Sequence, residues 1–386
     1  MSGTLWEWLR ARAVEIHVAE HLCERLERGD KLRVKLGVDP TAPDLHVGHL
    51  VVFDVLRAFQ EEGHTPVLIV GDYTARIGDP SGRSETRPVL SAEQVAENAA
   101  TYFEQAFRIL DRDRTEVHGN SEWLAGMDAA DILRLLGTQT LQSVLQREDF
   151  ATRLREGLPI GAHEILYPFN QAYDSVAVRA DVEIGGTDQL FNLLFGRDVQ
   201  RAYGQQPQDV AVFPLLEGLD GVQKMSKSLG NYVGVAEPPE EIYGKTMSIP
   251  DTLTEKYLRL VSGVGPEEVE RTLALAPRDA KAALARQLVR RLYGEEAAAR
   301  AEEDFEAKFR QRRRPDDVPT YRTGFPVRVV EGLVRSGVAR SNSEARRLLA
   351  QSGVRVNGQT VDDDRPLQPG DIVQVGKRHW LRFEVE

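Results

Sequence analysis

Two histidines and two lysines are the side chains of this chain whose types and spacing best suit chemistry on a phosphate group. His46 and His49 stand in the string His-Val-Gly-His, and Lys224 and Lys227 stand far downstream in Lys-Met-Ser-Lys-Ser. Imidazole and ammonium groups can stabilise the negative charge that gathers on a phosphate in a transition state. Either string alone is a weak signal, because short histidine or lysine clusters are usually ordinary surface or core features. Together they predict a site that cuts ATP between its α and β phosphates.

The first string falls where a strand is expected to give way to a helix. An apolar run at 32–38 predicts a buried strand, and the apolar run at 50–59 predicts a buried helix. Residues three apart on a helix share a face, so His46 and His49 can point at one ligand near the unpaired N–H groups of a helix N-terminus. Gly48 lacks the side chain that would keep a base or ribose away from the backbone.

The second string follows a glycine-rich turn at 218–221. Two ammonium groups on a mobile loop can move onto the β and γ phosphates and release them afterwards. A solvated basic loop is the alternative interpretation, and the histidine string upstream makes phosphate binding the favoured one.

A third set of side chains predicts a polar cavity. Tyr167, Gln171 and Asp174 are spaced as one face of a helix. The apolar residues around them argue against a purely solvent-facing stripe: Ile165, Leu166, Phe169 and Ala172.

The elements that must position these residues alternate between strand and helix patterns. Strands are expected at 32–38, 67–70 and 116–118, with helices near 46–59 and 91–110 between them. This alternation predicts an α/β fold with a parallel sheet, in which ligands bind beyond the carboxyl ends of the strands. Single helices are also expected over 10–28 and 127–146, and helix almost throughout 238–309.

Composition limits the class of protein. A chain of 386 residues is long enough for two or three domains, and its net charge of −11 does not suggest a nucleic-acid binder. However, residues 326–386 carry 10 Lys and Arg against 8 Asp and Glu, so charge distribution matters more than the sum. Cys23 is the single cysteine, which excludes an intrachain disulfide and a metal–thiolate cluster. With no signal-like or membrane-length apolar run, we expect a cytoplasmic protein with no membrane contact.

The last sixty residues read as a compact module. An Asn-Gly turn within 354–361 is a strong hairpin signal, and a final strand is expected at 372–375. Two short helices are expected at 329–335 and 341–351, the second opened by a capping box from Ser341 to Glu344. On or beside this second helix lie three arginines that could contact phosphates, unless they simply face solvent: Arg340, Arg346 and Arg347.

With its histidine string at 46–49 and its lysine string at 224–228, the chain resembles the class I aminoacyl-tRNA synthetases, and specifically the bacterial tyrosyl-tRNA synthetases. Further matching stretches lie at 71–83, 167–174 and 184–189, and the resemblance covers essentially the whole chain. Tryptophanyl-tRNA synthetases share the fold but lack the C-terminal module and the aspartate-bearing helix. The implied domains are a Rossmann-like parallel-sheet catalytic domain (1–222), the signature loop with an α-helical anticodon-region domain (223–310), a linker (311–325) and a small α+β RNA-binding domain like that of a ribosomal small-subunit protein (326–386).

The resemblance also implies a role for individual residues and a set of partners. Transition-state contacts to phosphate would come from His46, His49, Thr41, Lys224 and Lys227. Tyrosine would be bound by Asp79, Tyr167, Gln171, Asp174, Gln189 and Lys35, with Asp174 accepting the phenol hydrogen bond. ATP would be bound by Asp39, Gly48, Gly186, Asp188 and Lys227. The implied partners are L-tyrosine, ATP with Mg²⁺ held mostly by its phosphates, tRNA(Tyr) and a second copy of the chain, with no tightly bound cofactor and no protein metal site.

Three positions depart from the common family pattern. Lys35 stands where many members carry tyrosine, Glu183 where many carry glutamine, and Arg83 where many carry lysine. With Lys-Met-Ser-Lys-Ser in place of a Lys-Phe-Gly-Lys-Ser type of loop, these departures indicate the less common bacterial subfamily. We expect Lys35, beside Asp174, to alter how the phenol is recognised.

Two rival functions share part of this pattern. Another nucleotidyltransferase of the same superfamily would carry the histidine string but would not need an RNA-binding tail. A non-catalytic RNA-binding paralogue could keep the fold, but it would have little use for His46, His49, Lys224, Lys227 and Asp174.

Overall fold

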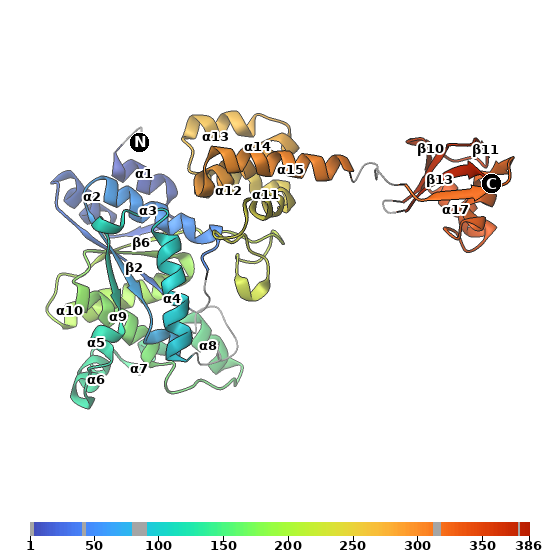
Figure 1. The fold of residues 1–386 in the computed structure, drawn as a ribbon. Helices are drawn as coiled ribbons and strands as arrows, with labels where there is room; N and C mark the ends of the chain where they lie inside the picture. Colours follow the sequence, from blue (N-terminus) through green and yellow to red (C-terminus); the bar gives the residue numbers. More distant parts are fainter. Residues whose placement is uncertain (1–3, 41–43, 79–90, 312–317, 377–378) are drawn as a thin grey trace. The chain divides into compact units, whose positions relative to one another are not determined.

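The computed structural model describes residues 4–40, 44–78, 91–311, 318–376 and 379–386, which form two compact units, Met1–Glu302 and Glu303–Glu386 (Figure 1). Thr41, Asp79 and Arg83 lie outside the described residues. The division falls inside helix α15 (Glu295–Gln311), upstream of the linker predicted at 311–325.

A six-stranded sheet in the order β1-β6-β5-β2-β3-β4 forms the centre of the first unit. Its strands are β1 (Glu15–His17), β2 (Arg33–Val38), β3 (Thr65–Val70), β4 (Glu116–Gly119), β5 (Val182–Gly186) and β6 (Asp209–Phe213). All neighbours are parallel except β1, which runs antiparallel to β6 at the edge, so the predicted α/β class is confirmed. The chain runs outward from β2 to β4 on one side and continues with β5 and β6 on the other. The point where the strand order reverses therefore lies between β2 and β5, where ligands bind in such sheets.

Helices cover both faces of this sheet. Figure 1 shows α1 (Leu5–Arg12) and α3 (Leu50–Glu61) on one side, and α9 (Leu166–Val178) and α10 (Leu190–Ala202) on the other. Because both faces are covered, the middle strands are apolar along their length; the run Val67–Val70 of β3 is fully buried. The remaining helices around the sheet are α4 (Ala92–Ala106), α5 (Ser121–Leu124) and α8 (Glu148–Arg155).

The single helix predicted over 10–28 is wrong. Strand β1 separates α1 from α2 (Ala19–Glu27), and Val18 before α2 has a left-handed backbone, φ 61°. The N–H of Val14 donates to the carbonyl of Val212 at 2.8 Å, so this segment extends the sheet edge. Pairing with β6, which lies about 190 residues downstream in the chain, overrides the local helical pattern.

The single helix predicted over 127–146 is also wrong. Gly137 caps the end of α6 (Ala129–Leu136), and α7 (Leu141–Leu145) begins anew after Thr140. The Thr140 side chain accepts a hydrogen bond from the N–H of Ser143, which is a regular helix N-cap.

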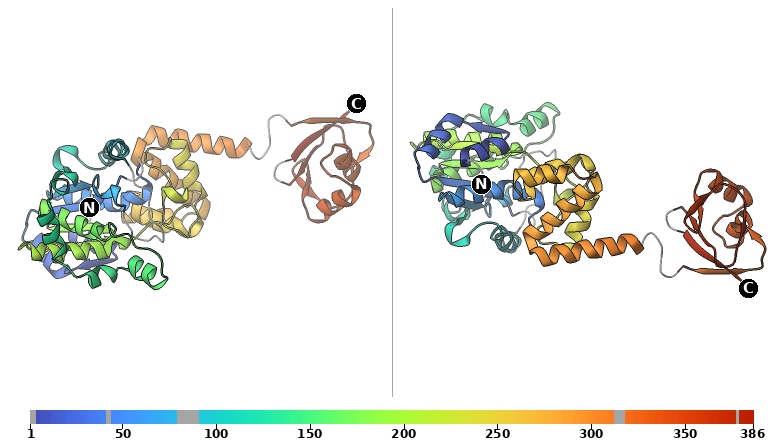
Figure 2. Two further views of the ribbon diagram at one scale, coloured as in Figure 1. Left: turned by 90° about the horizontal axis from the view of Figure 1, so that it is seen from below. Right: turned by 90° about the horizontal axis from the view of Figure 1, so that it is seen from above.

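Residues downstream of the sheet are helical, as predicted. The helices are α11 (Pro239–Ser248), α12 (Thr254–Val261), α13 (Pro266–Leu273), α14 (Pro277–Tyr293) and α15. Proline opens α11, α13 and α14 at the first helical position, where its missing N–H costs nothing. The turned views show these yellow and orange helices as a bundle beside the sheet (Figure 2). The Arg291 guanidinium of α14 pairs with Asp54 of α3, which ties the bundle to the helix behind the histidine string.

The second unit is a small α+β structure. Its five-stranded sheet has the order β10-β9-β12-β13-β7, and a separate pair joins β11 to β8. The strands are β7 (Thr320–Thr323), β8 (Val327–Arg328), β9 (Val354–Val356), β10 (Gln359–Val361), β11 (Pro366–Leu367), β12 (Ile372–Val375) and β13 (His379–Val385). The predicted hairpin is confirmed, with Asn357 at φ 49° and Gly358 at φ 86° in its turn. Helices α16 (Val329–Arg335) and α17 (Asn342–Ala350) pack on this sheet around one apolar core.

Two predictions for this region need correction. Strand β12 is not the last, because β13 follows and pairs with it. Part of the predicted linker is a strand, because β7 pairs in parallel with β13. The predicted capping box of α17 is confirmed in part. The Ser341 side chain accepts from the N–H of Glu344, as predicted. The Glu344 carboxylate accepts from the N–H of Arg340 and not from that of Ser341. Within the described ranges, no helix has the length and apolar character needed to cross a bilayer.

Candidate active site

A cavity of about 330 Å³ opens beyond the carboxyl ends of the parallel strands. It collects most of the residues that the sequence predicted for one site: Asp39, His46, Gly48, His49, Tyr167, Gln171, Asp174, Gly186, Asp188, Gln189 and Lys224. Lys35 and Lys227 are not among its lining residues. Thr41 and Asp79 lie outside the described residues.

The two signature strings meet through backbone hydrogen bonds. The N–H of Val47 donates to the carbonyl of Val233 at 2.8 Å, and the N–H of Val235 donates to the carbonyl of Leu45 at 2.9 Å. His46 and Gly234 form the β-bridge between these bonds. The segment that follows the lysine loop is thus fixed beside the histidines, although about 180 residues separate the two strings.

His46 precedes and His49 ends a single 3₁₀ turn, Val47–His49, that leads into α3. The backbone N–H of His46 donates to Nδ1 of His49 at 3.1 Å, so Nδ1 is an acceptor and Nε2 carries the proton of the neutral ring. Burial lowers the pKa of His49 to about 4, and burial followed by the charge of His49 lowers the pKa of His46 well below its ordinary value. Both rings are therefore neutral at pH 7 and can act as hydrogen-bond donors to an anion.

Close packing of the two rings requires Gly48. Their centroids lie 3.8 Å apart, and a Cβ atom at position 48 would meet Nδ1 of His46 at 3.0 Å. That Nδ1 atom is buried without a hydrogen-bond partner among the described residues. A side chain at Gly48 would displace the His46 ring and narrow the cavity.

Each lysine of the second string is bound to a carboxylate. Lys224 Nζ lies 2.9 Å from Asp188 Oδ2, and Lys227 Nζ lies 2.9 Å from Asp44 Oδ2. Both carboxylates come from elements of the sheet domain, one after β5 and the other just before the histidines. Lys224 therefore lines the cavity while paired with Asp188, and Lys227 is held beside the segment that leads into the histidines.

Asp220 and Asn231 shape the lysine loop, and the sequence analysis missed both. Asp220 accepts from the N–H groups of Val222 and Gln223 at 2.7 and 2.8 Å, and these bonds lower the pKa of its carboxyl group. Asn231 Oδ1 accepts from the N–H of Ser226 at 2.8 Å. The Asp-Gly pair at 220–221 was a turn signal that could have pointed to this role.

At the far end of the cavity, Asp174 is 3% exposed and accepts two hydrogen bonds. Trp123 Nε1 donates to one carboxylate oxygen at 2.8 Å, and Asn120 Nδ2 donates to the other at 3.3 Å. Burial raises the pKa of Asp174 to about 7, and the charge of Lys35 opposes this rise. The sequence analysis missed Asn120 and Trp123, although both follow the predicted strand 116–118, where polar residues of a site are expected.

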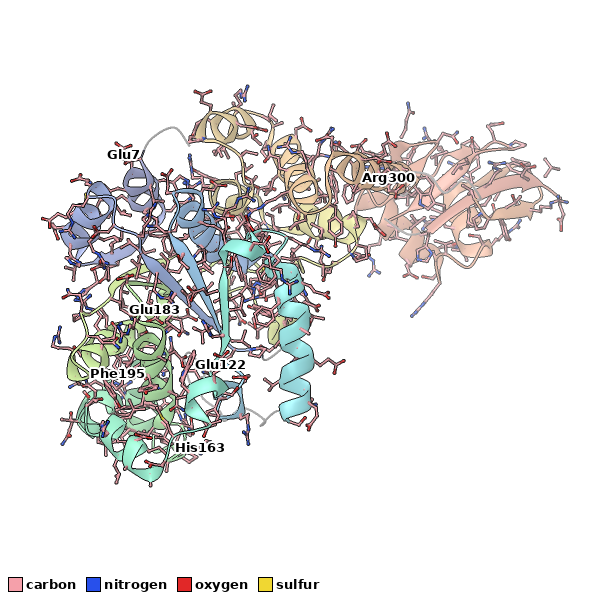
Figure 3. All side chains as sticks on the ribbon, turned by 60° about the vertical axis from the view of Figure 1, so that its left-hand side comes forward. Glu7, Glu122, His163, Glu183, Phe195 and Arg300 are labelled. Carbon is pink, nitrogen blue, oxygen red and sulfur yellow. The ribbon has the colours of Figure 1, made fainter. Side chains whose placement is uncertain are left out.

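Lys35 lies behind the cavity and pairs with Glu183. The two residues are register partners on β2 and β5, and Lys35 Nζ lies 2.9 Å from Glu183 Oε1. The ammonium also donates to Ser175 Oγ at 2.8 Å and to the carbonyl of Gln171 at 3.0 Å. Lys35 is 0% exposed and Glu183 is 1% exposed, and Figure 3 labels Glu183 among the strands of the sheet. Lys35 and Glu183, which both depart from the common family pattern, thus form one buried ion pair.

The carboxylate of Asp39 also lines the cavity. Asp39 accepts from the Tyr167 hydroxyl at 2.8 Å and from Thr74 Oγ1 at 2.8 Å. Gln171 Oε1 faces this cavity, buried and without a hydrogen-bond partner in the described part of the chain. A buried acceptor beside a carboxylate suits a ligand ammonium group, because leaving such an acceptor unpaired is costly.

Helix α4 supports the histidine string from outside, a role that sequence reasoning did not predict. Its side chains Asn98, Tyr102 and Gln105 are spaced along one face. Asn98 Nδ2 donates to the carbonyl of Pro40 at 2.9 Å, and Gln105 Oε1 accepts from the N–H of Leu45 at 2.7 Å. The Tyr102 ring is buried edge-on against His49, with 5.9 Å between ring centroids.

Comparison with known proteins finds matching families and relatives along nearly the whole chain. Residues 27–310 match the family "tRNA synthetases class I (W and Y)", and residues 327–373 match the S4 domain. The tyrosine–tRNA ligase of Thermotoga maritima is 50% identical, and the alignment covers 97% of this chain and 96% of that protein. The tyrosine–tRNA ligase of Carboxydothermus hydrogenoformans is 47% identical, with 98% and 97% covered. The structure of a C-terminally truncated Aspergillus nidulans mitochondrial tyrosyl-tRNA synthetase has the same fold, with a TM-score of 0.68 at 22% identity over 79% of this chain and 94% of that one.

Proposed function

The chain belongs to the tyrosine–tRNA ligases, a family of class I tRNA synthetases, and from this membership we propose how its residues divide the work of the reaction. The protein activates L-tyrosine with ATP and transfers tyrosine to its tRNA. In the first step the tyrosine carboxylate attacks the α-phosphate, which gives tyrosyl-adenylate and pyrophosphate. In the second step a terminal ribose hydroxyl of the tRNA attacks the adenylate carbonyl and releases AMP.

One observation carries this assignment to residues. The same cavity is lined by His46 and His49, by Lys224 of the second signature string, and by the buried Asp174. Positioning and electrostatic stabilisation are sufficient for a reaction of this kind, because no covalent enzyme intermediate is needed.

At the phosphate end, His46 and His49 donate hydrogen bonds as neutral rings. Their lowered pKa values support this role, because a neutral imidazole keeps one ring N–H that can donate to a phosphate oxygen. Lys224 and Lys227 leave their carboxylate partners and bind the β and γ phosphates as these acquire charge. Thr41 completes the set; it lies outside the described residues.

The adenosine part of ATP binds over Gly48 and Gly186, with Asp39, Asp188 and Gln189 near the ribose and the amino-acid groups. Mg²⁺ arrives on the ATP phosphates, since it keeps most of its coordination to phosphate and water in such sites. The carboxylates nearest to the lysines, Asp44 and Asp188, are each in an ion pair, which supports phosphate oxygens as the main ligands.

Tyrosine binds with its phenol at Asp174 and its ammonium group toward Gln171, Tyr167 and Asp79, of which Asp79 lies outside the described residues. A buried acceptor reserved for a hydroxyl rejects phenylalanine, because phenylalanine leaves that acceptor unpaired; this family is the standard example of such rejection. Lys35 does not touch the substrate in this arrangement. Its charge favours the ionised form of Asp174, so Lys35 acts as a positioning residue.

The C-terminal unit binds tRNA(Tyr). Its S4 match supports RNA binding, and Arg340, Arg346 and Arg347 are exposed at and along α17, where phosphates can reach them. We retain the proposed division into a catalytic domain (1–222), a loop and helical domain (223–310) and an RNA-binding domain, and we extend the last of these upstream to include β7.

Two copies of the chain form a homodimer through the end of the sheet domain that carries α6, α7 and α8. Leu133, Leu141 and Leu154 lie on these three consecutive helices and are 70%, 57% and 60% exposed, and a group of exposed leucines in one region is typical of a subunit interface. Leu133→Lys should therefore shift sedimentation toward a monomer, whereas Leu275→Lys, at a 49% exposed leucine in the helical bundle, should not.

A reaction that serves protein synthesis and a chain with a single cysteine both suit the cytoplasm.

Amino-acid-dependent exchange of pyrophosphate with ATP tests the proposal. Exchange with tyrosine, but not with tryptophan or phenylalanine, is the expected result. Exchange with tryptophan would reassign Asp174, and absence of exchange in folded protein would favour the non-catalytic RNA-binding alternative, for which the comparisons offer no support.

A further inference from the structure

The five-stranded sheet of the C-terminal unit has one face that the helices do not cover. Its other face contributes Val354, Val356, Val373, Val375 and Phe383 to the core with α16 and α17. Successive side chains of a strand point to opposite faces, so the residues between these point away from the helices.

Strand register places an arginine and a tryptophan in one row of this uncovered face. Gln374 on β12 is the register partner of both Arg355 on β9 and Trp380 on β13, so the three form one row across the sheet. In the next row of this face Arg382 is the partner of Thr320 on the edge strand β7. In the row after that, Glu384 is the partner of Arg322 of β7. We call this surface, made by Arg322, Arg355, Gln374, Trp380 and Arg382, the outer sheet face.

The arginines of the outer sheet face are available to a ligand. Arg322 and Arg355 are exposed, and Arg382 and Trp380 are partly exposed. Within the described ranges none of these three arginines forms an ion pair, whereas Arg328 and Arg335 elsewhere in the unit pair with Asp364 and Glu331. Glu384 is an acidic residue on the same face, which leaves an excess of positive charge around the tryptophan.

Proteins bind single-stranded nucleic acid by stacking bases on aromatic side chains while basic side chains contact the phosphates. The outer sheet face has this composition, because Trp380 stands in one row with Arg355 and Arg382 stands in the next row. Side chains of Arg also stack on bases themselves, which adds to the attraction.

We propose that the outer sheet face binds unpaired nucleotides of the tRNA, with a base stacked on Trp380 and phosphates bound by Arg355, Arg382 and Arg322. The proposal rests on the proposed function, because it takes tRNA as the partner. This surface is separate from the one proposed above, because α17, which carries Arg346 and Arg347, packs on the opposite face of the sheet.

Binding of a tRNA(Tyr) transcript to the full-length chain, measured over a range of salt concentrations, tests the proposal. Trp380→Ala should weaken binding about tenfold, and Trp380→Phe, which keeps an aromatic ring, should recover most of the loss. The Arg355→Gln/Arg382→Gln double variant should reduce the slope of log affinity against log salt by about 2, because two phosphate contacts are lost. Arg335→Gln is the matched control, because Arg335 is an exposed arginine of the same unit on α16.

Two outcomes overturn the proposal: an unchanged affinity and salt slope in the double variant, or an equal loss in the Arg335→Gln control. If Trp380→Ala fails to fold, Trp380→Phe and the double variant still decide the matter. Tyrosine-dependent pyrophosphate exchange should stay at the wild-type rate in every variant. Failure of the proposed function would instead abolish exchange in the unmodified protein, so the two failures are distinguishable.

Discussion

Lys227 Nζ lies 2.9 Å from Asp44 Oδ2, so the second lysine of the loop is bound to a carboxylate two residues before the first signature histidine. Lys224 is bound in the same way to Asp188. In the proposed mechanism both ion pairs break when the ammonium groups bind phosphate. The two signature strings are thus connected by side chains as well as by the backbone bridge at His46 and Gly234.

Replacing Asp44 by asparagine should tighten ATP binding. The substitution removes the carboxylate that competes with phosphate for Lys227, and a partly exposed pair of this kind is worth up to about 1 kcal/mol. We therefore expect the KM for ATP in pyrophosphate exchange to fall by up to about fivefold, with tyrosine KM unchanged. A rise in the KM for ATP would show that Asp44 holds Lys227 in a productive position instead.

Replacing Lys227 by alanine should slow adenylate formation and leave tyrosine binding nearly intact. Removing one preorganised group that stabilises transition-state charge commonly costs 10²–10³ in rate, so we expect a loss on the order of 10². Stopped-flow measurement of adenylate formation and equilibrium dialysis with tyrosine separate the two effects. A variant that forms adenylate at the wild-type rate would remove Lys227 from the mechanism.

Tyrosine affinity should rise between pH 6 and pH 8. Burial raises the pKa of Asp174 to about 7, so below that pH the carboxyl group of the free protein is protonated and is a poorer acceptor for the phenol. Above it the ionised group is available, and affinity should level off. Because the folded pKa lies above the ordinary value of 3.8, the same group reduces the stability of the fold as pH rises from about 4 to about 7, and its effect is constant above that. Asp174→Asn should bind tyrosine weakly at every pH, and a pH dependence that survives in this variant would assign the titration to another group.

The sequence predicted the parts of this molecule that depend on local patterns, and it missed those that depend on pairing between distant segments. The strand before His46 and the hairpin at Asn357 were visible as periodicity and turn chemistry. Lys35 and Glu183 were visible as unusual residues, but their pairing across β2 and β5 is a matter of register over about 150 residues. The same limit explains why Trp123 was missed, because nothing in its neighbourhood indicates that it meets Asp174.

Replacing Lys35 by methionine should destabilise the protein by about 3–5 kcal/mol, because the Glu183 carboxylate would be left buried without its partner. Adding Glu183→Gln should recover most of this loss, since the glutamine needs no counter-charge. The free energies of unfolding in urea of the two single variants and the double variant form a complete cycle. Additive effects would show that the two side chains are not energetically coupled.

Removal of residues 312–386 should separate tRNA charging from amino-acid activation. This cut leaves α15 whole and removes β7 together with the sheet it belongs to, whereas a cut before Pro326 would leave β7 without its partner β13. We expect tyrosine-dependent pyrophosphate exchange near the wild-type rate, because the cavity lies wholly in the first unit. Charging of tRNA should fall on the order of 10²-fold at limiting tRNA, since several phosphate contacts are lost at once. An equal loss of both activities would mean that the first unit needs the second in order to fold.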